Sequence, residues 1–351
     1  MFELKEQIAP ILKEMAETTP ENFVMMEVCG THTMNIAKLG LRTLLPKRIK
    51  IISGPGCPVC VTSSKDIKTA IEIAKLPDTI VATFGDMLRV PSDGDSLQNY
   101  KNVKVIYSPM EALALAKANG DKEVVLLGIG FETTAPLTAA VIKEAKKMDL
   151  KNFSVLCMHK TVPQALELIM QSKNIKINGF LLPGHVCTIT GSDHFNFISK
   201  FNFCGVVAGF EALNIISSVN ELVKRFVESK YGVFNNYRPV VTEAGNLVAQ
   251  AMVKDVYEEV DSFWRGIGLI KSSGLKLRDA YSKYDAQKRF DLKVEDVKDP
   301  NNCRCGDILK GEALPTDCIY YGKECTPSNP VGPCMVSTEG TCAAFYKYVE
   351  E

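Results

Sequence analysis

The sequence contains no long uninterrupted run of hydrophobic residues. Its longest apolar stretches, such as VVLLGIGF from Val124, are too short to cross a lipid bilayer. The N-terminal stretch MFELKEQIAPILKEMAE has charges spread along an amphipathic helical pattern and lacks the apolar core of a signal peptide. We therefore expect a cytoplasmic protein with no membrane partner.

An excess of charge of either sign is also missing. The 351 residues carry 41 basic and 41 acidic side chains, so no basic surface for a nucleic-acid partner is expected. The sequence has no Walker-type G-x4-G-K-[ST] motif, so any nucleotide site would be unconventional. It also has no C-x3-C-x2-C motif, which disfavours a radical S-adenosylmethionine enzyme.

Histidine is scarce, with four residues, whereas cysteine is abundant, with twelve. Half of the cysteines are scattered before residue 205, none lies between Cys204 and Cys303, and the others crowd between Cys303 and Cys342. Structural disulfides are rare in a reducing cytoplasm. This distribution therefore indicates metal or redox chemistry.

Short apolar runs alternate with helical patterns over the first two thirds of the chain. Apolar residues recur at helical spacing between the runs, for example in residues 64–74 and 134–148. Strands that alternate with helices predict parallel sheets in an α/β fold. The predicted strands are residues 22–28, 48–53, 79–83, 103–107, 123–127, 153–157, 179–182 and 205–207.

Parts of this pattern occur twice. IYSPMEAL from Ile106 resembles VVAGFEAL from Val206, and VCGTH from Val28 resembles GFETT from Gly130. Any two α/β units share some strand–glycine–helix texture, but the similar offsets favour a duplication. We expect two related Rossmann-like parallel-sheet domains and a third, mostly helical or irregular domain. Their residues are 22–120, 121–230, and 231–351 together with an N-terminal helix in 1–21.

The chemically distinctive loops all follow predicted strands. In open parallel sheets, ligands bind beyond the carboxyl ends of the strands. If the two halves face each other, these loops line one cleft. The loops are CGTHT (29–33), GPGCPVC (54–60), ETT (132–134), HKT (159–161) and PGHVC (183–187).

Cys29 lies between a strand and a helix predicted from Thr33 to Leu45. A helix N-terminus lowers the pKa of a thiol and favours the thiolate, which is the form that binds metals or attacks. The alternative is a small buried apolar residue. His32, in the same loop, favours a functional role.

Cys57 and Cys60 form a C-x-x-C motif. The spacing suits a redox dithiol, half of a zinc site, or two ligands of one iron atom. Structural zinc needs a second such motif or a histidine pair, and neither follows at ordinary spacing. The glycines and prolines around the motif predict an exposed, reactive pair rather than two packed thiols.

Glu132 begins a predicted helix, where the helix dipole already favours a carboxylate, and its place in the cleft also makes it a candidate for proton transfer. His185, close to Cys187, is either a functional residue or a hydrogen-bonded structural one. The same alternatives hold for His159. Two further thiols lie inside strand patterns and are predicted to be core residues, namely Cys157 and Cys204.

The cysteine-rich tail has the spacing C-x-C, twelve residues, C-x6-C, eight residues, C-x7-C. Glycines, prolines and turns fill the gaps, so ligands rather than a large core are expected to hold it together. A four-cysteine [4Fe–4S] cluster is the first interpretation and a four-thiolate zinc site the second. Because neighbours in C-x-C rarely bind one cubane, Cys303 and Cys305 are given different roles. We assign Cys303, Cys318, Cys325 and Cys342 to the cluster and Cys305 and Cys334 to a redox disulfide.

The motifs CGTHT, GPGCPVC, GFETTAP and PGHVC and the ending NPVGPCMVSTEGTCAA together resemble the HypD family, over nearly the whole chain. The resemblance implies a maturation factor that helps to build the iron–cyanide–carbonyl centre of nickel–iron hydrogenases. It also implies two partners, HypC, which shares the iron with Cys29, and HypE, which supplies cyanide. Cys57 and Cys60 would act beside Cys29 in iron binding or redox chemistry, and the tail would carry a [4Fe–4S] cluster.

Under this interpretation the chain is a monomer that joins a heteromeric complex, an assembly scaffold for an Fe(CN)2CO unit rather than a classical turnover enzyme. Cys29, His32, Cys57, Cys60, Glu132 and His185 are its expected working residues. The alternative is a cluster-dependent protein disulfide reductase similar to ferredoxin:thioredoxin reductase. The two interpretations differ at Cys29, because a reductase has no need of the CGTHT loop.

Overall fold

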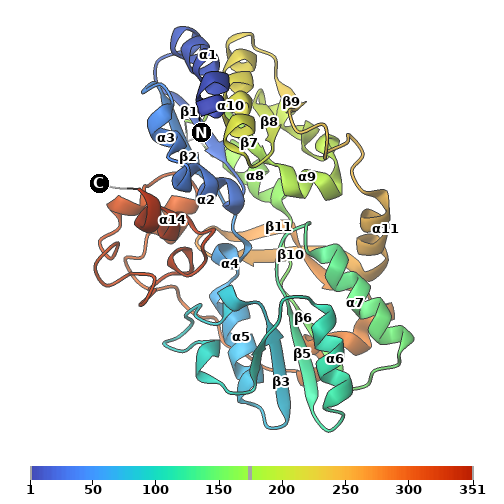
Figure 1. Cartoon of the computed structure of the whole chain (residues 1–351). Helices are drawn as coiled ribbons and strands as arrows, with labels where there is room; N and C mark the ends of the chain where they lie inside the picture. The colour runs from blue at the N-terminus through green and yellow to red at the C-terminus, as the bar shows by residue number, and fades with distance from the viewer. Residues whose placement is uncertain (1, 173–175, 350–351) are drawn as a thin grey trace.

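Two separate parallel β-sheets form the body of the protein (Figure 1). The computed structural model describes residues 2–172 and 176–349. The five-stranded sheet has the order β2-β1-β7-β8-β9, and the four-stranded sheet has the order β4-β3-β5-β6. The strands are β1 (Phe23–Glu27), β2 (Ile49–Ser53), β3 (Thr79–Thr83), β4 (Val103–Val105), β5 (Glu123–Gly128), β6 (Phe153–Cys157), β7 (Gly179–Pro183), β8 (Cys204–Ala208) and β9 (Gly232–Asn235).

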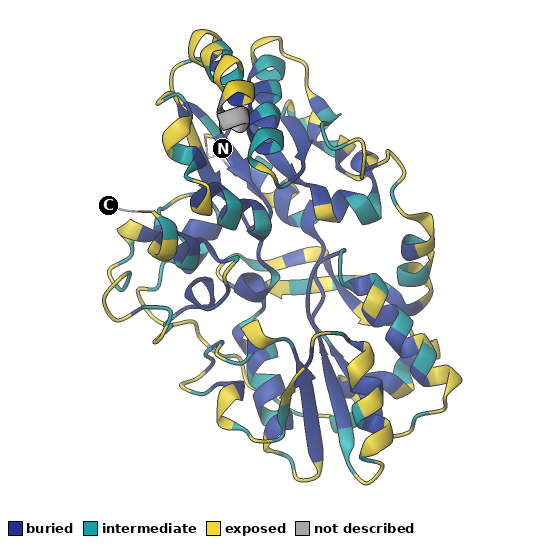
Figure 2. Cartoon of the chain, in the orientation of Figure 1, coloured by how far each residue is buried: buried dark blue, intermediate teal, exposed yellow. Residues whose placement is uncertain are grey.

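The α/β fold is confirmed, and each of the eight predicted strands is present. Every residue of β3, β7 and β8 is buried, which explains their continuous apolar runs, because parallel sheets are covered on both faces (Figure 2). The short strand β9 was not predicted. Its sequence GVFN offers only four residues, too few for a periodic pattern.

Helices cover both sheets and connect their strands. In the upper part of Figure 1, α1 (Phe2–Thr18) and α10 (Ala212–Val227) pack side by side on the five-stranded sheet. The other helices of the sheet regions are α2 (Gly30–Lys38), α3 (Leu41–Leu44), α4 (Pro58–Val61), α5 (Ser64–Lys75), α6 (Met110–Ala118), α7 (Ala135–Lys147), α8 (Val162–Gln171), α9 (Gly184–Thr190) and α11 (Leu247–Val256). None of the helices in the described part of the chain is both long and apolar enough to span a membrane.

The sheets do not divide the chain at residue 120, as the predicted domains 22–120 and 121–230 would require. After β2 the chain leaves the five-stranded sheet, builds β3 to β6 of the other sheet, and returns to β7. The reason is that β1 pairs with both β2 and β7. Strands from before and after the β3 to β6 segment therefore lie in one sheet. The loops after β1, β2 and β7 therefore share one sheet edge, whereas GFETTAP follows β5 in the other sheet.

The N-terminal helix does not join the C-terminal region, contrary to the prediction. Helix α1 buries Ile8 and Met15 in the core of the five-stranded sheet. Its Glu14 accepts a hydrogen bond from Asn220 and forms an ion pair with Lys224, both on α10. The amphipathic pattern of α1 was recognised correctly, but a periodic face does not specify which surface will cover it.

The C-terminal third contains a β-hairpin that was not expected in a mostly helical or irregular domain. Strands β10 (Tyr257–Trp264) and β11 (Gly268–Leu277) pair in antiparallel fashion and lie between the two sheets in Figure 1. Beyond the hairpin, the chain has short helices and turns, as predicted. These include α12 (Ala286–Phe290), α13 (Cys305–Leu309) and α14 (Thr341–Tyr348).

Candidate functional site: three thiol groups between two sheets

The CGTHT and GPGCPVC loops touch through their backbones. Gly30 N donates a hydrogen bond to Gly56 O (2.9 Å), and a Cβ atom on Gly56 would lie 2.3 Å from Cys29 N. Because β1 and β2 are adjacent and parallel, both loops leave the same edge of the sheet. Only a glycine fits at residue 56, so the close approach of the two loops is built into the sequence.

Glu27 lies beneath the CGTHT loop and was not recognised in the sequence. Its carboxylate is buried and accepts hydrogen bonds from Thr33 Oγ1 (2.6 Å) and Cys29 N (3.1 Å). Burial raises the pKa of Glu27, and the hydrogen bonds oppose that rise. A glutamate at the end of an apolar strand was a signal, since a buried carboxylate needs partners.

Cys29 is buried at the N-cap of α2. The expectation of a low thiol pKa is wrong for the free thiol. Burial raises the pKa of Cys29 to about 12, and the nearby Glu339 and Glu27 carboxylates raise it further. Desolvation of the thiolate outweighs the favourable helix N-terminus, because burial disfavours the charged form. A positive charge at the thiol is therefore needed to stabilise the thiolate.

Cys57 and Cys60 are joined by a disulfide bond across one turn of α4, with Cα atoms 5.3 Å apart. Cys60 N donates a hydrogen bond to Cys57 Sγ (3.2 Å). The expected exposure is wrong, because the exposed fractions are 3% for Cys57 and 0% for Cys60. The hairpin bridges to Thr62, and the tail covers Cys60 from the other side, with Pro333 O 3.9 Å from its Sγ atom.

His32 is buried and faces the five-stranded sheet. Its Nε2 atom donates to Gly209 O (2.9 Å), and its ring stacks on Phe210 with centroids 4.6 Å apart. The ring of His185 stacks on the same phenylalanine at 3.8 Å. Burial lowers the pKa of His32 to about 4, so its ring is neutral near pH 7. The aromatic stack therefore ties the CGTHT and PGHVC loops together.

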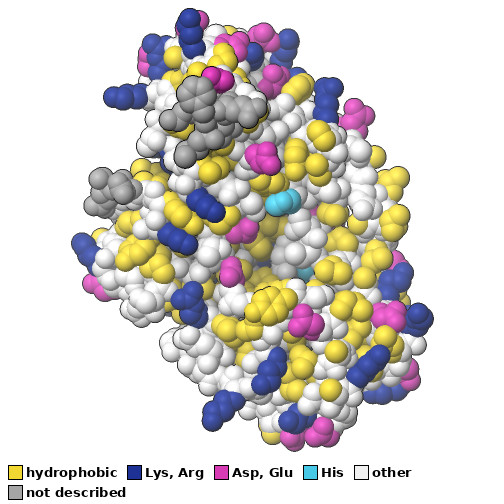
Figure 3. Space-filling view, in the orientation of Figure 1, with side chains coloured by type: hydrophobic (Ala, Val, Ile, Leu, Met, Phe, Trp, Pro, Cys, Tyr) yellow, Lys and Arg dark blue, Asp and Glu magenta, His cyan; other side chains and the backbone are white. Residues whose placement is uncertain are grey.

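Glu132 comes from the opposite sheet and is also buried. One carboxylate oxygen accepts a hydrogen bond from Val162 N (2.9 Å), and the other has no partner among the described residues. Burial raises the pKa of Glu132 to about 7. The pKa of the Cys187 thiol is raised well above its usual value, first by burial and then by the charges of Glu132 and Cys29. Cys187 is thus an additional buried thiol, on α9 in the PGHVC segment. Figure 3 shows this face of the molecule hollowed between the two halves.

Cys157 and His159 lie away from these loops. Cys157 Sγ is 3.5 Å from His159 Nδ1 and donates to Leu275 O (3.0 Å), on the hairpin. Cys157 is half-buried rather than fully buried, and with His159 it lines a cavity of about 680 Å³ beside the hairpin. Cys204 is buried at the start of β8, in agreement with the prediction of a core residue.

The tail divides its cysteines into one disulfide and four free thiols. Cys305 and Cys334 form the disulfide, with Cα atoms 6.4 Å apart. The same division into four and two was predicted from the spacing. The four free thiols line one cavity with apolar and aromatic side chains, and they are Cys303, Cys318, Cys325 and Cys342.

Four free cysteines that line one cavity could serve as the ligands of a four-cysteine iron–sulfur cluster. Val331 N donates a hydrogen bond to Cys325 Sγ (3.3 Å), and a Cβ atom on Gly332 would lie 2.9 Å from Cys303 Sγ. Burial raises the pKa of Cys342, and the charges of Cys325, Cys303 and Cys318 raise it further. Within residues 2–172 and 176–349, no three His, Cys, Asp or Glu side chains converge closely enough to hold a single metal ion.

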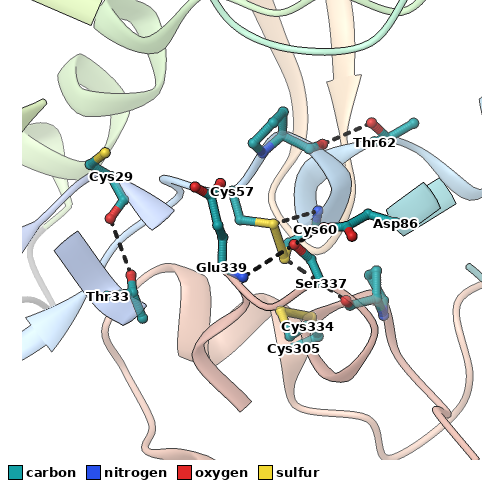
Figure 4. The surroundings of a disulfide bond; sticks show 12 residues. Cys29, Thr33, Cys57, Cys60, Thr62, Asp86, Cys305, Cys334, Ser337 and Glu339 are labelled. Atoms are coloured by element: carbon teal, nitrogen blue, oxygen red, sulfur yellow. Dashed lines mark hydrogen bonds between the residues drawn. A yellow bond between two sulfur atoms is a disulfide. The ribbon is translucent and has the colours of Figure 1, made fainter. Parts of the chain in front are cut away.

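The tail brings its disulfide next to the first one. Figure 4 shows Cys305–Cys334 beside Cys57–Cys60, with Cys29 to the left of both disulfides and Glu339 between them in this view. The contact between Cys60 and Pro333, the residue before Cys334, joins the two. The sequence did not reveal this contact, because the two segments are 273 residues apart.

Comparison with known proteins shows the family of this chain. The family model described as "HypD: Hydrogenase formation hypA family" matches residues 3–349. The chain is 42% identical to hydrogenase maturation factor HypD of Escherichia coli, over 100% of this chain and 96% of that protein. It is 44% identical to HypD2 of Bradyrhizobium diazoefficiens (95% and 91%) and 42% identical to HypD of Azotobacter vinelandii (95% and 91%). The chain therefore belongs to the HypD family of hydrogenase maturation factors.

Proposed function

We propose that this chain is the scaffold on which the Fe(CN)2CO unit of a nickel–iron hydrogenase is assembled, in a complex with HypC and HypE. The observation that carries the proposal is the backbone contact between Cys29 and Gly56. It brings the loop that holds the free, buried Cys29 against the loop that holds the C-x-x-C disulfide, at one sheet edge. Thiolates are soft ligands that suit iron carrying cyanide and carbonyl groups.

The iron is cargo in this proposal, and Cys29 is its first ligand on this chain. A bound cation supplies the positive charge that the buried thiolate lacks, so iron binding and loss of the thiol proton are coupled. Reduction of the Cys57–Cys60 disulfide takes two electrons and two protons and yields two thiols. Both thiols would then be available in the loop that contacts the Cys29 loop, as further ligands or as a redox pair.

A [4Fe–4S] cluster on Cys303, Cys318, Cys325 and Cys342 would supply one-electron chemistry to the tail. The Cys305–Cys334 disulfide lines the same cavity as the four thiols, and Pro333 connects it to Cys60. Contacts thus run from the four thiols of the proposed cluster to the tail disulfide, and from there to the C-x-x-C disulfide. This order supports transfer of electrons toward the iron-binding loop.

HypC and HypE are proposed to act at the hollow between the sheets, where the CGTHT, PGHVC and GFETTAP loops meet. His185 is exposed there, whereas His32, Glu132 and Cys187 are buried. A partner that contributes a second thiolate would complete the iron coordination from the open side. The buried residues on this chain hold the loops, and Glu132 is the proton-transfer candidate.

The test is anaerobic co-purification with HypC, followed by infrared spectroscopy of the cyanide and carbonyl bands. Cys29→Ala should fold, keep iron and sulfide in the tail, and show neither set of bands. Cys157→Ala is the matched control, because its thiol contacts the hairpin and His159 and lies away from the CGTHT and GPGCPVC loops, and it should give bands of normal intensity. Normal bands in Cys29→Ala would overturn the iron site.

The neighbouring disulfides also support a second candidate, a cluster-dependent protein disulfide reductase. In that case the dithiol at Cys57 and Cys60 would reduce a separate protein, and Cys29 would be dispensable. Reduction of a disulfide-bonded protein by the Cys29→Ala variant at the wild-type rate, together with normal hydrogenase maturation, would favour the reductase over the scaffold.

A further inference from the structure

Arg265 is a buried cation that none of the motifs includes. It directly follows the hairpin strand β10 and turns toward the tail, with only 5% of its surface exposed. Its Nε atom forms an ion pair with Asp299 (2.7 Å), and its backbone N donates to Val61 O (2.8 Å), next to Cys60. Nη1 donates a hydrogen bond to Pro91 O (3.3 Å). The guanidinium is therefore held by Asp299 and Pro91, and the backbone of Arg265 is held by Val61.

Arg265 shares a cavity with Cys303, one of the four proposed cluster ligands. Arg265, Asp299, Cys303 and Cys305 line this space of about 170 Å³. The hairpin tip is fixed against the tail by two glycines. A Cβ atom on Gly306 would lie 2.3 Å from Gly266 O, so neither side can move away by a rotamer change. The cation thus keeps a set position relative to Cys303.

The opposite charges of Arg265 and Asp299 do not cancel at the cluster, because the two side chains differ in their exposure to water. The side chain of Arg265 is 4% exposed, whereas that of Asp299 is 43% exposed. Asp299 also lines the larger cavity of about 680 Å³ on the other side of the pair. Solvent screens an exposed charge far more than a buried one, so the positive charge of Arg265 is screened less than the negative charge of Asp299. Asp307, the other carboxylate that lines the smaller cavity, is paired with Arg304 (3.1 Å) and Lys310 (3.5 Å).

We propose that Arg265 sets the reduction potential of the tail cluster by holding a buried positive charge beside its ligand Cys303. A cluster gains one negative charge on reduction, and a fixed cation nearby stabilises that form and raises the potential. This inference rests on the cluster assigned under the proposed function. It adds a residue that tunes the cluster without being a ligand.

The test is a spectroscopic redox titration of the anaerobically purified chain after measurement of its iron and acid-labile sulfide. Arg265→Gln should load a full cluster with a more negative midpoint. We expect about a tenfold lower ratio of reduced to oxidised cluster at a fixed potential, which is about 59 mV for one electron. Arg265→Lys should keep most of the wild-type midpoint, and Asp299→Asn should raise the midpoint slightly.

Lys323→Gln is the matched control. Lys323 lies in sequence between two proposed ligands, but its side chain is exposed, so its removal should leave the midpoint unchanged. An unchanged midpoint in a fully loaded Arg265→Gln variant, or a shift equal to that of Lys323→Gln, would overturn the inference alone. A wild-type chain without iron and sulfide would overturn the cluster assignment itself. If Arg265→Gln fails to load a cluster, the Asp299→Asn variant is the deciding one. A midpoint that does not rise in Asp299→Asn would then overturn the proposal.

Discussion

Thr31 donates a hydrogen bond of 2.7 Å to the carboxylate of Glu339, 308 residues further along the chain. This contact fastens the cysteine-rich tail to the first turn of α2, next to Cys29. It leaves no room for a side chain at Gly30, where a Cβ atom would lie 2.5 Å from Glu339 Cβ. The iron-binding loop and the tail are thus packed as one unit.

Replacing Glu339 with alanine should loosen this unit. A hydrogen bond to a charged group contributes about 1.5–3 kcal/mol, so we expect a loss of that order in the free energy of unfolding. The same change in a Thr31→Ala background should cost clearly less, because the partner is already gone. Chemical denaturation of the two single variants and the double variant measures this coupling, and strictly additive effects would refute it.

Gly56→Ala should separate the CGTHT and GPGCPVC loops. The new methyl group would collide with the Cys29 backbone, so we expect a loss of several kcal/mol in unfolding free energy, or loss of the cyanide and carbonyl bands in the complex with HypC. Gly120→Ala is the control, since nothing lies within 4 Å of the position that its Cβ atom would take, and no change is expected. Wild-type stability and bands in Gly56→Ala would show that the close contact is not needed.

The cluster ligands are testable by colour and metal content. Cys318→Ala should strip the iron and sulfide and loosen the tail, because metal binding in such a segment is also folding energy. Cys334→Ser should keep the cluster absorbance and change only the thiol titration. Retention of the full cluster in Cys318→Ala, or its loss in Cys334→Ser, would require a different assignment.

Glu132 should make stability depend on pH between its unfolded pKa of 4.5 and its folded pKa of about 7. The folded state holds the proton more tightly, so stability is complete below pH 4.5 and falls as the pH rises through 7. The Glu132→Gln variant has no ionisable side chain at this position, so it does not lose stability in this way as the pH rises. Its unfolding free energy relative to wild type should therefore rise by a few kcal/mol between about pH 5 and about pH 8.

Urea denaturation at the two pH values measures that change. Glu167→Gln is the control, because Glu167 is exposed on α8 and its replacement should give the same difference from wild type at both pH values. An equal difference for Glu132→Gln at the two pH values would mean that Glu132 is ionised in the folded protein at both.

Local sequence features were enough to predict the eight strands β1 to β8 and the grouping of the cysteines. Continuous apolar runs such as those of β3 and β8 can only be satisfied by burial on both faces of a sheet. The glycines and prolines of GPGCPVC require a tight turn, and the spacing of the tail cysteines separated Cys305 and Cys334 from the other four. The short strand β9 and the polar alternation of β10 are weaker signals, which is why they were missed.

Only the tertiary structure decided which of these pieces meet. The pairing of β1 with β7 placed two loops about 150 residues apart at one sheet edge and broke the expected division at residue 120. Burial of Cys29 and Cys60 also came from distant segments, namely the hairpin and the tail. The sequence determined the elements and their chemistry because these depend on neighbouring residues. The environment of each thiol depends on long-range packing and desolvation, which no local pattern records.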